Sequence, residues 1–172
     1  MTRAIYEITK IKIENRDYYE ALFTLERAEY LDIDEKVIKK FKMFINGVTA
    51  MMKKNYQEGV RILTELEEDR EKPLSNFLKP LFYSTRSYGN MAMERHQQAR
   101  EDLEAMESEF SLDLPNLYNK FICEGILACN NNKYENALTF FSKASKTLPY
   151  RIEPAFYKAV SLICFATKVL PK

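Results

Sequence analysis

Few residues of this 172-residue chain have the types and spacing that chemistry needs. His96 is the only histidine, which excludes a histidine-based catalytic triad and a zinc site built on two histidines. Cys123, Cys129 and Cys164 are six and 35 residues apart, without the short Cys-x-x-Cys spacing of metal and redox sites. The four glycines are isolated, so there is no glycine-rich phosphate loop. We predict no catalytic residues, no metal site and no cofactor.

Acidic clusters are the remaining candidates, because paired carboxylates can act as general acid and base. Carboxylates gather in residues 65–71 and again in residues 101–104. Charged runs of this kind are also typical of solvated helix faces. We interpret both runs as solvated faces, and His96 as a packing residue. The sequence therefore predicts that the protein is not an enzyme.

Composition limits the partners. Lys and Arg number 26 against 25 Asp and Glu, which leaves no basic field for nucleic acid. The most apolar stretch, 159–166, is far shorter than the roughly 20 residues that a membrane-spanning helix needs. Three cysteines, an odd number, do not suggest a disulfide framework. We expect a cytoplasmic protein in a reducing, intracellular compartment, with no nucleic acid and no membrane span.

A repeated pattern predicts the elements that make up the fold. Small residues recur at intervals of 38, 40 and 38, at Ala21, Gly59, Ala99 and Ala137. Three residues before each lies a ring: Tyr18, Tyr56, His96 and Tyr134. Four residues after each lies a large apolar residue: Leu25, Leu63, Leu103 and Phe141. Three positions further on come Ala28, Leu66, Met106 and Ala144. Such spacing places these residues on one helix face that must pack against a neighbour.

Each copy is preceded by another apolar-periodic helix and a polar break, so each unit is predicted to be an αα-hairpin. With only four glycines and six prolines, the composition also favours an all-α fold. The predicted helices are 3–14, 16–30, 35–53, 55–70, 74–93, 95–109, 115–130, 133–147 and 152–169.

These residues resemble the tetratricopeptide repeat family. The fourth unit matches its motif at Phe121, Gly125, Ala128, Tyr134, Ala137, Phe141, Ala144 and Pro149. The second unit matches at Gly47, Ala50, Tyr56, Gly59, Leu63 and Leu66. Units one and three carry Thr9 and Ser87 at the place of the first-helix glycine, and are divergent copies.

The resemblance implies one domain, 1–172, folded as a right-handed α-solenoid of about four tetratricopeptide-type hairpins. The repeats would cover about 2–35, 40–73, 80–113 and 118–151, followed by a C-terminal helix at about 152–169. The protein would work by binding another protein, as an adaptor or scaffold of a multiprotein complex. Alternatives are a client-specific chaperone that shields an apolar segment, or a fragment of a longer regulatory, ciliary or transport protein.

In this family the first helices line a concave groove, and the resemblance places apolar residues there. They are Phe41, Phe44, Ile45, Val48, Met51, Met52, Leu81, Tyr88, Met91, Ile122 and Ile126. An apolar groove suits an amphipathic helix or extended segment of a partner. Alternatively, tight superhelical curvature or the end of the chain covers these positions.

The C-terminal helix offers a second surface. Apolar residues nearly surround it, although the last helix of a solenoid normally turns a polar face to solvent. We predict an interface at Phe156, Val160 and Ile163, for a partner or for self-association. The alternative is a lone capping helix that tolerates an exposed apolar face.

Overall fold

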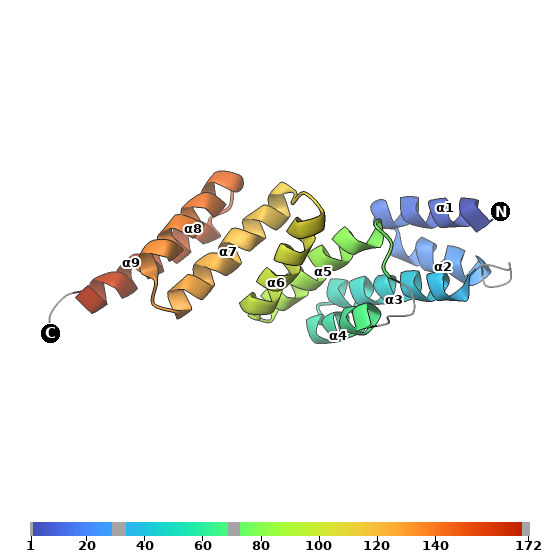
Figure 1. Cartoon of the computed structure of the whole chain (residues 1–172), viewed down its shortest axis with the longest axis horizontal. Helices are drawn as coiled ribbons and strands as arrows, with labels where there is room; N and C mark the ends of the chain where they lie inside the picture. Colours follow the sequence, from blue (N-terminus) through green and yellow to red (C-terminus); the bar gives the residue numbers. More distant parts are fainter. Residues whose placement is uncertain (1, 29–33, 69–72, 170–172) are drawn as a thin grey trace. The chain divides into compact units, whose positions relative to one another are not determined.

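The computed structural model describes residues 2–28, 34–68 and 73–169. The chain divides into two compact units, Met1–Gly89 (unit 1) and Asn90–Lys172 (unit 2), with the boundary inside helix α5. Within the described ranges the fold is all-α, and its helices follow one another as sequential hairpins (Figure 1). The helices are α1 Thr2–Glu14, α2 Tyr18–Ala28, α3 Glu35–Met52, α4 Tyr56–Glu68, α5 Leu78–Ala92, α6 His96–Glu109, α7 Leu114–Asn130, α8 Tyr134–Thr147 and α9 Glu153–Val169.

The predicted helices agree with these bounds, with one correction. The helix predicted at 74–93 begins at Leu78. Its start is set by Ser75, whose Oγ accepts a hydrogen bond from the Leu78 N–H at 3.3 Å. Pro80 then falls in the first turn, where no intrahelical N–H bond is lost. Predicted helix residues 29, 30, 69 and 70 lie outside the described residues.

Four hairpin turns share one backbone conformation. Each has three residues, and the second has positive φ: 63° at Arg16, 61° at Lys54, 59° at Glu94 and 60° at Asn132. In the second turn the Lys54 N–H donates to Met51 O at 2.9 Å, and the Asn55 N–H to Ala50 O at 3.0 Å. The other three turns repeat both bonds, which are the carbonyl caps of a left-handed helix end. The turn therefore recurs with the same period as the sequence pattern.

Small residues on first helices let second helices approach closely. A Cβ added at Gly125 of α7 would lie 2.7 Å from two ring atoms of Phe141 on α8. A Cβ at Gly47 of α3 would lie 2.9 Å from Leu63 Cγ on α4. Thr9 and Ser87, which stand at the same place in the other units, are fully buried, and their hydroxyls donate to carbonyls of their own helices. Each hairpin thus has a small residue at its closest approach or a hydroxyl satisfied locally.

Each unit has its own core. In unit 1 the fully buried large side chains include Phe41, Phe44, Leu63 and Phe82. In unit 2 the cluster comprises Tyr118, Ile122, Ala128, Ala137, Phe141, Ala144 and Leu148. Within 2–28, 34–68 and 73–169, no helix has the length and apolarity to cross a membrane.

The turn conformation predicts the effect of glycine at Lys54. Replacing a non-glycine residue at positive φ removes steric strain, so Lys54→Gly should raise the free energy of unfolding by about 0.5–1 kcal/mol. Lys53 is the matched control, because its φ is −80° and glycine there only adds unfolded-state entropy. Urea unfolding should show a lower free energy of unfolding for Lys53→Gly than for the parent chain. A lower free energy of unfolding for Lys54→Gly would contradict the claim that Lys54 is strained.

The close approach at Gly125 predicts a coupled pair. Gly125→Ala should lower the free energy of unfolding by about 1–3 kcal/mol, because the added methyl meets an aromatic ring that cannot fold away. Phe141→Leu supplies the residue found at this place in the other three repeats and should restore most of the loss. A double-mutant cycle measured by urea unfolding tests this coupling; strictly additive losses would argue against it.

Candidate partner-binding site

Most of the predicted groove residues of α3 lie in the core of unit 1. Phe41, Phe44, Ile45, Val48 and Met51 are at most 7% exposed, whereas Met52 is 64% exposed. A partner could reach the five buried side chains only if unit 1 opened. Among the predicted groove residues on α3, Met52 is therefore the one that a partner can reach in the folded state.

The packing around α3 explains this burial. The ring of Tyr6 on α1 lies edge-on to Phe41 at 5.2 Å, and the ring of Phe77 stacks on it at 6.3 Å. Met51 fills the space left by two glycines: a Cβ at Gly59 would lie 2.6 Å from its Cγ, and one at Gly89 2.5 Å from its Cε. Phe41 is thus covered by rings from α1 and from the segment just before α5, and Met51 by the close approach of α4 and α5 at Gly59 and Gly89.

The remaining groove residues have mixed exposure. Leu81 is half-buried and Tyr88 is 52% exposed in unit 1, where the Tyr88 ring lies edge-on to Tyr56 at 6.0 Å. In unit 2, Ile122 is buried, and Met91 and Ile126 are half-buried against the core cluster. The groove stays a prediction, with Met52 and Tyr88 as its most exposed members.

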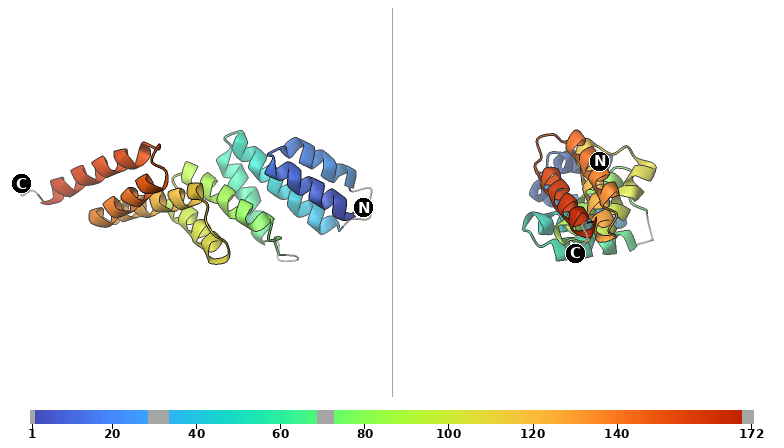
Figure 2. Two further views of the ribbon diagram at one scale, coloured as in Figure 1. Left: turned by 90° about the horizontal axis from the view of Figure 1, so that it is seen from above. Right: turned by 90° about the vertical axis from the view of Figure 1, so that its left-hand side faces the viewer.

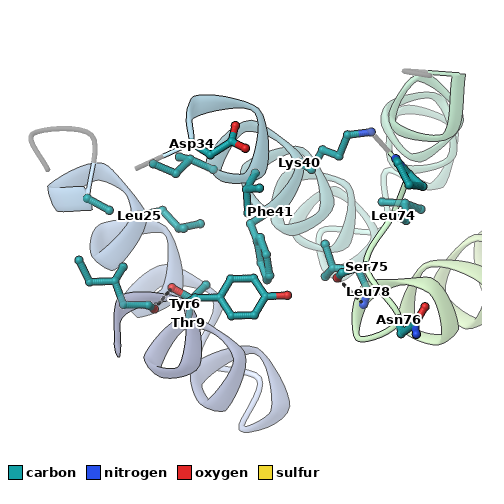
Figure 3. A pocket seen from close by; sticks show the side chains of 15 residues that line it. Tyr6, Thr9, Leu25, Asp34, Lys40, Phe41, Leu74, Ser75, Asn76 and Leu78 are labelled. Atoms are coloured by element: carbon teal, nitrogen blue, oxygen red, sulfur yellow. Dashed lines mark hydrogen bonds between the residues drawn. The ribbon is translucent and has the colours of Figure 1, made fainter. Parts of the chain in front are cut away.

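Unit 1 also contains a cavity of about 770 Å³ (Figure 3). Its lining is mostly apolar, with residues from α1, α2, α3, the segment before α5 and the first residue of α5; Tyr6, Leu25, Phe41 and Leu78 are among them. Figure 3 shows the Tyr6 ring beside Phe41, with the chain on both sides of the space. A cavity of this size and lining can accept an apolar side chain or small apolar molecule.

Helix α9 exposes a broad apolar face in unit 2. Phe156 is 67%, Val160 40% and Ile163 64% exposed, and the spacings of four and three place them on one side of the helix. Leu162 is a further exposed apolar residue of this helix, whereas the ring of Phe165 lies edge-on to Tyr134 of α8 at 6.4 Å, on the packed side. The structure thus brings together the three residues predicted for a C-terminal interface.

The opposite side of α9 is firmly packed. α8 and α9 lie side by side in Figures 1 and 2. The Tyr157 ring stacks on Phe141 at 5.1 Å, and Ser161 Oγ lies 3.1 Å from Cys129 Sγ of α7. Ser161 also donates to the carbonyl of Tyr157 at 2.7 Å. These contacts fix the orientation of the helix and leave the Phe156, Val160 and Ile163 face in solvent.

The predicted interface did not include two exposed apolar residues, one on α9 and one just before it. Leu162 is 53% and Ile152 80% exposed. The sequence does show apolar residues all around this helix. It does not show which of them touch α8 and which remain exposed.

Burial shifts the pKa values of several titratable groups in unit 2. Burial raises the pKa of the Cys123 thiol to about 12, and that of the Tyr118 hydroxyl to about 12. Burial lowers the pKa of His96, and the charge of Glu94 opposes this shift. His96 is half-buried at the start of α6. Among the described residues, no group of three His, Cys, Asp or Glu side chains is placed to hold a metal ion.

One carboxylate differs from its prediction. The run 101–104 was expected to form a solvated face, yet Asp102 is only 3% exposed and accepts a hydrogen bond from Asn90 Nδ2 at 3.2 Å. The prediction holds for Glu101 and Glu104 and is wrong for Asp102, which connects α6 to the last turn of α5. This hydrogen bond between side chains stabilises the α5–α6 turn.

The repeated turns and close helix approaches define a tetratricopeptide-type helical-repeat fold, and solved structures bear this out. No family model and no curated protein sequence matches the chain. Its fold is similar to that of MamA, a tetratricopeptide-repeat protein. "MamA MSR-1 C2" matches with a TM-score of 0.61 at 11% identity, over 96% of this chain and 87% of that one. MamA residues 41 to the end from Desulfovibrio magneticus RS-1 match with a TM-score of 0.54 at 14% identity, over 96% and 92%.

Burial of Cys123 predicts selective thiol chemistry. At pH 8, iodoacetamide should modify Cys123 at least about tenfold more slowly than the half-buried Cys164, because the reactive thiolate is disfavoured and access is blocked. Peptide mass spectrometry over time gives both rates. Because burial raises the folded-state pKa of Cys123 from 9.0 to about 12, the free energy of unfolding should fall as pH rises through that range. Equal alkylation rates would show that α7 opens readily.

Proposed function

We propose that this chain is a non-catalytic protein-binding module that acts as an adaptor or scaffold in a multiprotein complex. The observation that supports this most strongly is the exposed apolar face of α9 at Phe156, Val160 and Ile163. Leaving such side chains in water costs about 25 cal/mol per Å² of apolar surface, and contiguous exposed patches usually mark interaction sites. A fold alone does not decide a function, so the proposal rests on this surface.

Unit 1 supplies a second surface of the same module. Met52 and Tyr88 are the most exposed residues of the predicted groove, at 64% and 52%. Methionine adapts its shape to irregular partners, and tyrosine combines an apolar ring with a polar tip, so both suit protein contacts. An amphipathic helix or extended partner segment would contact this surface through these two residues.

A client-specific chaperone is the second candidate function, favoured by the apolar cavity of unit 1. A cavity of about 770 Å³ could shield an apolar side chain of a client. The adaptor is preferred because the α9 face presents a larger set of exposed apolar side chains.

We also place the protein in a reducing, cytoplasmic compartment. The support is that Cys123, Cys129 and Cys164 are all free thiols, two of them half-buried.

Affinity purification with matched surface variants tests the adaptor. The tagged chain, Ile163→Asp and Met52→Lys would be purified under reducing conditions from cells that contain the protein, and co-purifying proteins identified by mass spectrometry. Both replaced side chains are 64% exposed, so circular dichroism should show unchanged folding. We expect Ile163→Asp to lose a stable set of partners that the parent chain retains.

The Met52→Lys variant distinguishes the two surfaces. Loss of the set with Met52→Lys alone would transfer the function to the unit 1 groove. Recovery of the same set with all three chains would contradict binding through either surface.

A further inference from the structure

Helix α9 matches α7 in length and in the positions of several residues. Both helices have 17 residues, and a shift of 39 residues aligns their ends. The same shift aligns Pro115 with Pro154, the second residue of each helix, and Tyr118 with Tyr157. The shift lies within the range of 38 to 40 that separates the repeats. By position, length and sequence, α9 corresponds to the first helix of a hairpin.

In the α7–α8 hairpin the corresponding face of α7 is covered. Phe121 lies under Lys143 Nζ, 5.5 Å from the ring centre, and Gly125 lies against the Phe141 ring. The 39-residue shift relates Phe121 to Val160 and Gly125 to the small residue Cys164. The face of α9 that contains Val160 is therefore the one that a second helix covers in α7.

We propose that this face binds one amphipathic helix of a partner protein, which completes the hairpin in trans. The helix would run antiparallel to α9, as α8 follows α7 through a three-residue turn. It would carry the second-helix pattern of this chain: a ring, a small residue three positions later, a large apolar residue four further on, and an alanine or larger apolar residue after three more. The inference rests on the proposed protein-binding function and specifies the chemistry of its partner.

α7 and α9 differ in charge, and this difference indicates which residue the partner helix needs opposite α9. Burial raises the pKa of Glu124 on α7, and the positive charges of Lys120 and Lys143 oppose this shift. The residue of α9 that corresponds to Glu124 is Ile163. Lys143 is exposed, and its Nζ lies over the rings of Phe121 and Phe140. Beside α9, a lysine at this place would meet Val160 instead of Phe121 and Ile163 instead of Glu124, so it would lose both the ring and the negative charge. We therefore expect an apolar residue at this place of the partner helix, in contact with Val160 and Ile163.

The sequence after α9 favours a helix from another chain. The position that corresponds to Asn132, the turn residue with φ of 60°, is Pro171. Proline as a residue type is restricted to φ near −65°, so the sequence does not repeat the turn that begins the other second helices.

Two peptides and one variant test the proposal. Each fluorescent peptide copies residues 132–149, one unchanged and one with Lys143→Leu, and each is titrated by anisotropy with the full chain or its Ile163→Glu variant to about 1 mM. We expect the parent chain to bind the leucine peptide at least about tenfold more tightly than the lysine peptide. Ile163→Glu should reverse the preference, because it restores on α9 the negative charge that Glu124 supplies near Lys143 on α7. Ile163 is 64% exposed, so the variant should fold normally.

Other outcomes overturn the inference. Absence of binding, or equal binding of both peptides by both chains, would exclude a second-helix partner. A chain whose mass by light scattering is twice that of the monomer, and returns to the monomer mass with Ile163→Glu, would assign the face to a second copy. If the peptides fail while Ile163→Asp still loses its cellular partners, the protein-binding function stands and only this partner class is wrong.

Discussion

Close approach of the two helices within each hairpin is the interaction on which the rest of the structure depends. α7 and α8 can meet as they do because Gly125 has no side chain and Phe141 fills the space opposite it. The three-residue turn with its left-handed residue fixes how one helix returns along the other. Where glycine is missing, a buried hydroxyl that bonds to its own helix takes its place. The sequence pattern therefore repeats with the same period as this contact between helices.

The same constraint explains where apolar surface remains. A first helix needs cover on two sides: α7 receives it from α6 and α8. α9 is packed against α8 through Tyr157 and against α7 through Ser161, but its other side leaves Phe156 and Ile163 exposed. The exposed face of α9 thus corresponds to the side of α7 that α8 covers.

Sequence periodicity was sufficient for most of the fold, because helix pairing here is local. The ends of α9, its apolar face and the hairpin turns all follow from residues close together in the chain. The burial of Phe41 was not predictable, because Tyr6 and Phe77, each about 35 residues away, provide its cover. Asp102 was misjudged for a similar reason: its partner Asn90 lies on another helix. The start of α5 depended on whether Ser75 or an earlier residue capped it.

Hydrogen exchange of the chain alone tests most directly whether α9 is an uncovered first helix. Amides of residues 158–167 would be compared with those of 119–128, which are the matching positions of α7. We predict at least about tenfold faster exchange in α9, since a helix packed on one side opens more easily than one packed on two. Equal protection of both helices, at a concentration where the chain is monomeric, would contradict the account.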